Sequence, residues 1–149
     1  MDLQTQINDE IKNAMKAKDT VALDTLRAIK SAILLVQTES GAKSELSKDD
    51  EIKLLQRLVK QRKESARIYT EQGREDLAQP ELEQVKIIEK FLPAQLSEEE
   101  IRKIISQIIA DTGVNGIAQM GQVMGEANKR MAGKADGKTI STVVKSLLA

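Results

Sequence analysis

The chain has 149 residues, 23 of them basic and 23 acidic, so its formal net charge at neutral pH is zero. That balance argues against strong non-specific binding to nucleic acid, and against DNA as a partner, because such binding needs a dense positive field. Cysteine and histidine are absent, which excludes disulfides, thiolate chemistry, Ser-His-Asp triads and most zinc sites. Aromatic residues make up only 1% of the chain, too few for the stacking platforms of modules that bind single-stranded RNA.

The sequence shows no sign of export or of membrane insertion. The first residues lack the basic start and the apolar run of a signal peptide. The longest strictly apolar run, at 32–36, is far too short to cross a bilayer. We therefore expect a soluble cytoplasmic protein with no membrane partner.

The first predicted elements are two helices joined by a tight turn. Apolar residues at every fourth position from Leu3 to Met15 place one face of a first helix against a core. A second helix is predicted over 20–38, with Asp19 or Thr20 as its N-cap.

A long third helix and a fourth helix follow a polar loop at 39–46. Ser47 precedes an acidic triplet in the pattern of a capping box and opens the third helix, which Gly73 ends. Residues 74–79 resemble a short turn or helical stub, so Pro80 is predicted as the first residue of the fourth helix.

The charged clusters of these helices have ordinary structural explanations. The acidic triplets at 49–51 and 98–100 lie in the first turn of a helix, where negative charge is favoured by the helix dipole. Arg62 falls near the apolar stripe of the third helix, and we expect Glu83 or Glu89 to form an ion pair with it. None of these clusters predicts a metal site or a catalytic site.

Three helices are predicted in the last part of the chain. The fourth helix ends before Pro93, because the residue before a proline avoids the α region, and we place a domain boundary there. Ser97 caps the next helix, which Gly113 ends. A shorter helix around 117–127 follows, and Asp136 caps the last one.

We predict an all-α protein in two parts, because no segment shows the alternation of a strand. The first part is an N-terminal helical bundle over 1–93, and the second is a small three-helix domain over 94–149. Tyr69 and Phe91 are the only aromatic residues, so the core must consist of aliphatic side chains and methionine.

Glycine and positive charge gather in the last third of the chain. Six of the eight glycines lie at 113–137, and residues 112–149 contain five basic and two acidic residues. Glycine in a helix costs about 1 kcal/mol relative to alanine, so this concentration indicates tight turns or close approach of a partner. Gly121 and Gly125 either pack against another helix or let a nucleic-acid backbone approach. The candidate residues for binding a phosphate-bearing partner are Lys129, Arg130, Gly133, Lys134, Gly137 and Lys138.

The segment 133–139 superficially resembles a nucleotide-binding phosphate loop. Only three residues separate its glycines where the Walker spacing requires four, and no strand precedes it. Two interpretations stay open. The first amides of the last helix, with Lys134, Lys138 and the Thr139 hydroxyl, could hold one RNA phosphate. Alternatively, Asp136 caps the helix and occupies that position.

Five stretches of the chain resemble the YqeY-like family in order and in spacing. They are KQRKES at 60–65, GREDLA at 73–78, FLPAQLSEEE at 91–100, MGQVMG at 120–125 and GKADGK at 133–138. That family is similar to the C-terminal tail of GatB, a subunit of the glutamine-dependent tRNA amidotransferase. The resemblance implies a two-part helical fold with a GatB-tail-like second part, a bacterial cytoplasm, and contact with tRNA through the candidate residues named above.

The preferred hypothesis is a non-catalytic accessory protein that binds tRNA, or a tRNA-bearing enzyme, through its C-terminal domain. Family labels imply carbon-nitrogen ligase activity, but no catalytic or ATP-binding motif is visible, and we expect no cofactor and no metal. One alternative is a component of glutamine-dependent amide transfer, which would need partner subunits to supply the ATP and amidase sites. Another is a module for protein-protein interaction.

Overall fold

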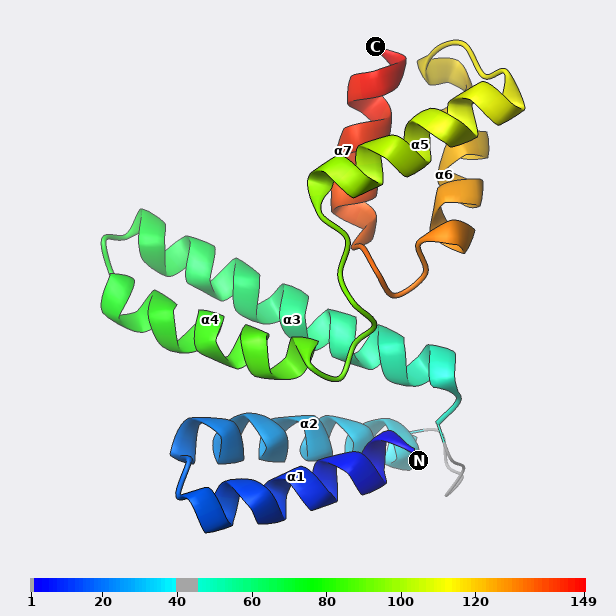
Figure 1. The fold of residues 1–149 in the computed structure, drawn as a ribbon. Coiled ribbons are helices and arrows are strands. Elements are labelled where there is room, and N and C mark those ends of the chain that lie inside the picture. The colour runs from blue at the N-terminus through cyan, green and yellow to red at the C-terminus, as the bar shows by residue number, and fades with distance from the viewer. Residues whose placement is uncertain (1, 40–45) are drawn as a thin grey trace. The chain divides into compact units, whose positions relative to one another are not determined.

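The structure is a computed structural model, which describes residues 2–39 and 46–149. Within these ranges it contains seven α-helices, one short 3-10 helix and no strand (Figure 1). The predicted all-α fold is therefore confirmed. Positions 40–45 of the predicted polar loop lie outside the described residues. Contacts divide the chain into two compact units, Met1–Leu92 and Pro93–Ala149.

The first unit consists of two helical hairpins. One joins α1 (Leu3–Ala17) to α2 (Thr20–Glu39), and the other joins α3 (Lys48–Glu71) to α4 (Glu75–Glu89), as Figure 1 shows. The hairpins meet where α2 packs against α4 and α3.

The core of the first unit is aliphatic. Ile7, Ile29 and Ile88 have less than 1% of their surface exposed, and burying a side chain of this size contributes roughly 1.5–3 kcal/mol. Phe91 packs partly buried against this core. The other core residues are Leu3, Ala14, Leu26, Ile33, Leu54, Leu55, Leu58, Val59 and Val85.

The turn between α1 and α2 lies where it was predicted. One residue of α1, Met15, faces away from the core instead of toward it. Lys18 adopts the left-handed conformation with φ 56°, which ends α1. Asp19 is the cap of α2, because its carboxylate accepts the Ala22 N–H at 3.1 Å. The prediction that Met15 faces the core is wrong, since its side chain is 56% exposed and Ala14 is buried in its place.

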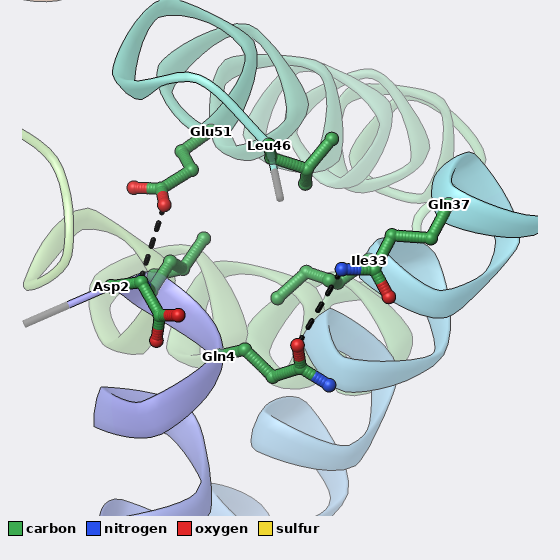
Figure 2. A pocket seen from close by; sticks show the side chains of 7 residues that line it. Asp2, Gln4, Ile33, Gln37, Leu46 and Glu51 are labelled. Atoms are coloured by element: carbon green, nitrogen blue, oxygen red, sulfur yellow. Dashed lines mark hydrogen bonds between the residues drawn. The ribbon is translucent and has the colours of Figure 1, made fainter. Parts of the chain in front are cut away.

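The start of α1 is held by two carboxylates, and Figure 2 shows how that of Glu51 reaches it. Asp2 is the N-cap and accepts the Thr5 N–H at 2.8 Å. Hydrogen bonds from the side chain and backbone of Thr5 lower the pKa of the Asp2 carboxyl. Glu51 reaches across from α3, and its Oε1 accepts the Leu3 N–H at 3.2 Å. Two of the amides that a helix start leaves unpaired are thus satisfied, one of them by a residue 48 positions away.

The fourth helix begins earlier than predicted. Pro80 is not its first residue but lies inside α4, which starts at Glu75. Ala78 is fully buried, so the turn before the proline already belongs to the packed part of the helix. A proline at this place removes one backbone hydrogen bond, and the helix continues through it.

Arg62 has a different partner from the one predicted. Its Nε donates to the amide oxygen of Gln84 at 2.7 Å, and not to Glu83 or Glu89. Glu89 lies instead 3.8 Å from the ammonium group of Lys63. A neutral amide oxygen satisfies the half-buried guanidinium without desolvating a second charge.

The second unit contains three α-helices, α5 (Glu98–Thr112), α6 (Met120–Arg130) and α7 (Gly137–Leu148), each packed against the other two. The 3-10 helix η1 (Ile117–Gln119) leads into α6. The predicted cap Ser97 and the predicted stop Gly113 are both present. The core contains no aromatic residue and consists of Ile101, Ile105, Ile108, Val114, Val123, Ala127, Met131, Ile140, Val143 and Val144.

Candidate functional site

The candidate site is built around the turn between α6 and α7, residues 131–136, here named the lysine loop. Met131 opens it and is fully buried in the core, which anchors the loop to the second unit. Gly133 has φ 77°, in the left-handed region that favours glycine. The Lys134 N–H donates to the Met131 carbonyl at 2.9 Å. The loop therefore has a defined backbone although it belongs to neither helix.

All four predicted cations are exposed, and three of them are lysines placed around this loop. Lys129 lies in the last turn of α6, Lys134 in the lysine loop and Lys138 in the first turn of α7. Among the residues that the structure describes, none provides an ion pair or a hydrogen bond to these three ammonium groups. All three are therefore available to an external anion.

Arg130 differs from the three lysines. Its Nε donates to Glu126 at 3.0 Å, and its Nη2 lies 3.5 Å from a carboxylate oxygen of Asp111. The guanidinium thus links α6 to the end of α5 and is already balanced by two negative charges. This arrangement gives Arg130 a structural role within the second unit.

The start of α7 is capped by its own chain. The Asp136 carboxylate accepts the Thr139 N–H at 2.6 Å, and Gly137 is the first residue of the helix. Of the two interpretations left open by the sequence, the structure has the capped turn. Because a carboxylate already occupies the positive end of the helix dipole, a phosphate would have to bind through the lysine ammonium groups.

A second stretch of chain lies alongside the lysine loop. Residues 93–97, here named the connecting segment, run from the start of the second unit to α5. The Leu96 N–H donates to the Lys134 carbonyl at 2.9 Å. The Leu96 side chain packs partly buried against the core of the unit. One backbone hydrogen bond and one apolar contact thus hold the two stretches together.

Gln95 adds a side-chain link between the same two stretches. Its Nε2 donates to the Gly133 carbonyl at 2.9 Å and to the Pro93 carbonyl at 2.7 Å. Sequence reasoning missed this residue. Its only signal was its place in the stretch 91–100, which carried part of the family resemblance.

Gly121 and Gly125 lie on an exposed part of α6. A Cβ atom added at either position would meet no other atom within 4 Å. The interpretation that they pack against a neighbouring helix is therefore wrong within the second unit. They leave the surface of α6 low and open.

Other parts of the molecule offer little chemistry. No group of three or more acidic side chains in residues 2–39 and 46–149 is arranged to hold a metal ion. A hollow of about 240 Å³ in the first unit lies between the ends of α1, α2 and α4, with Leu26 and Phe91 among its lining residues. A second, smaller hollow of about 20 Å³ lies next to Glu51 (Figure 2). In the described helices no stretch is both long enough and apolar enough to span a bilayer.

Comparison with known proteins agrees with the resemblance seen in the sequence. The family model of the YqeY-like protein matches residues 4–148. "Altered inheritance of mitochondria protein 41, mitochondrial" of Clavispora lusitaniae is 30% identical, over 97% of this chain and 86% of its own length. A Thermococcus gammatolerans protein named as a subunit of glutamyl-tRNA(Gln) amidotransferase is 30% identical over 77% of this chain, which is 20% of that longer protein. The chain belongs to the YqeY-like family.

Proposed function

We propose that this protein is a non-catalytic accessory factor that binds tRNA, or an enzyme carrying tRNA, through its second unit. The observation that carries the proposal is the set of three exposed, unpaired ammonium groups around the lysine loop: Lys129, Lys134 and Lys138. The similarity to a subunit of a glutamyl-tRNA(Gln) amidotransferase supports the choice of tRNA over other polyanions. A cytoplasmic location is part of the same proposal, although the fungal relatives are named as mitochondrial proteins.

The chemistry of the surface favours contacts with phosphate over contacts with bases. Lysine ammonium groups neutralise phosphates and release counterions, whereas base recognition in single strands depends on aromatic stacking. Both aromatic residues of the chain, Tyr69 and Phe91, belong to the first unit. The proposed ligand is therefore the backbone of a folded RNA, and the expected affinity is modest because only three cations contribute.

A second candidate function is participation in glutamine-dependent amide transfer. Its support is the similarity to amidotransferase subunits of two Thermococcus species, of which the chain spans only 20% and 23%. The remaining four fifths of such a protein has no counterpart in this chain, so partners would have to supply the chemistry. Co-purification with amidase and ATP-binding subunits would favour this function. A pure protein-protein module would show no RNA affinity at low salt and no effect of charge reversal at Lys134 and Lys138.

The test is a titration of the full-length protein with tRNA at several salt concentrations. We expect log affinity to fall linearly with log salt, and the Lys134→Glu, Lys138→Glu double variant to weaken binding and to flatten that slope. The matched control is Lys53→Glu, Lys60→Glu, which reverses two exposed lysines of α3 in the first unit. If the wild type and the Lys134→Glu, Lys138→Glu variant have equal salt slopes, these lysines do not belong to the RNA-binding site. If only the control loses binding, the site lies on α3.

A further inference from the structure

The conformation of the lysine loop rests on a small set of contacts, in which Met131 is buried in the core and Ala135 packs against it. Its one fully buried side chain is Met131, while Lys134 is exposed and lies three residues further along. Between them, Gly133 has a left-handed backbone conformation, which glycine adopts without steric strain. Beside these contacts, the backbone from which the Lys134 side chain extends is held through the carbonyl groups of residues 133 and 134.

Those two carbonyl groups are both held by the connecting segment. Leu96 binds the Lys134 carbonyl through its backbone, and Gln95 binds the Gly133 carbonyl through its side chain at 2.9 Å. The second hydrogen bond of Gln95, to the Pro93 carbonyl at 2.7 Å, fixes the side chain on its own segment. Gln95 is otherwise exposed and contributes no apolar surface to the core, so burial does not explain it.

We propose that Gln95 is a positioning residue for RNA binding, which ties the connecting segment to the lysine loop and so holds Lys134 where a phosphate can reach it. This inference rests on the proposed function. It adds that the connecting segment, which carries no positive charge itself, controls where Lys134 lies. The ligand that it concerns is the phosphate backbone of the RNA.

The variant that tests this role is Gln95→Met, which keeps the length of the side chain and removes both donors. We expect it to weaken tRNA binding by about fivefold and to reduce the salt slope by about 1, the signature of one lost phosphate contact. The matched control is Gln107→Met on α5, where the lost hydrogen bond goes to Asp111 of the same helix at 2.8 Å and not to a residue of the lysine loop. The control is expected to bind as the wild type does.

A double-mutant cycle separates positioning from a general loss of structure. If Gln95 acts through Lys134, then Gln95→Met added to Lys134→Met will weaken binding no further, because coupled residues do not contribute additively. The proposal is overturned if the losses in binding caused by Gln95→Met and Lys134→Met add up and the salt slope of Gln95→Met equals that of the wild type.

A measurement without RNA distinguishes failure of this inference from failure of the proposed function. Hydrogen exchange of the Leu96 amide, which bonds the Lys134 carbonyl, is expected to be faster in Gln95→Met than in the wild type and in Gln107→Met. Unchanged exchange overturns the positioning role, whatever the RNA result. A wild type that binds no tRNA overturns the proposed function, and with it the ligand assigned to Gln95.

Discussion

At the scale of single residues, the glycines of the second unit fall into two kinds. Gly133 has φ 77°, which an L side chain rarely adopts. Gly121 and Gly125 lie in the regular helix α6, with open space where a side chain would be. The left-handed backbone explains why residue 133 is a glycine. The fold gives no structural reason for Gly121 and Gly125, although glycine lowers the stability of a helix.

Replacing these glycines by alanine is expected to have opposite effects on stability. Gly121→Ala and Gly125→Ala should each raise the free energy of unfolding by about 1 kcal/mol, because alanine is the better helix former and meets no obstacle. Gly133→Ala, the contrasting variant, should lower it by roughly 1–2 kcal/mol, because of its left-handed backbone. Denaturant unfolding measures all three, and a destabilised Gly125→Ala would show that the residue packs after all. A stabilised variant with weaker tRNA binding would place the RNA on α6.

The candidate site was only partly predictable from its residues. Charge and composition identified the lysines, because excess positive charge in a sequence is visible without a structure. Pairing is not visible, so Arg130 was grouped with the lysines although Glu126 and Asp111 balance it. Gln95 was missed because a neutral side chain has no pattern in sequence, and its partner Gly133 lies 38 residues away.

At the scale of elements, α1 depends on carboxylates at its start. Asp2 caps it locally, and Glu51 of α3 accepts the Leu3 N–H. Asp2 must be ionised to accept its hydrogen bond with full strength. The hydrogen bonds from Thr5 lower the pKa of Asp2 in the folded state, so the ionised cap favours folding.

The first unit is therefore expected to lose stability in acid through Asp2. A carboxyl with a lowered pKa in the folded state stabilises the protein above its unfolded-state pKa, near pH 4, and loses this contribution as the pH falls through the lower folded value. Asp2→Asn keeps a capping side chain that does not titrate, so its stability should fall less steeply below about pH 4. Urea unfolding at several pH values measures this, with Asp9→Asn, an exposed position within α1, as the control. Identical acid profiles for Asp2→Asn and the wild type would contradict it.

Helix boundaries with a side-chain cap were predicted well, and so were the ends of α3 and α5 before Gly73 and Gly113, whereas the start of α4 was not. Ser47, Ser97 and Asp136 each accept the amide three residues on, an interaction within one turn that the local sequence specifies. The start of α4 was placed too late because Pro80 is a strong local signal. Packing against α3 overrides it, and tertiary packing of this kind leaves no local pattern.

At the scale of the whole molecule, the described residues form two separate cores, and we expect the two units to fold separately. The second unit buries Ile105, Ile108, Val123 and Val144 among its own helices. A fragment of residues 93–149 falls in the range of about 55–65 residues in which many domains fold alone. The predicted boundary between 93 and 94 remains a prediction about domains until such fragments are made.

We expect the fragment 93–149 to be helical and to unfold cooperatively. Its helices each contact the other two, so none is left with an apolar face without a partner. Circular dichroism with thermal melting measures this, and the fragment 1–92 provides the comparison. A fragment 93–149 without a cooperative transition, alongside a full-length chain that has one, would show that the second unit depends on the first.

The distribution of aromatic residues has a practical consequence for spectroscopy. Tyr69 and Phe91 both belong to the first unit, and the chain contains no tryptophan. The second unit is consequently silent in near-ultraviolet absorption and in intrinsic fluorescence. A single tryptophan introduced there would emit without background, and would report events at the lysine loop independently of the rest of the chain.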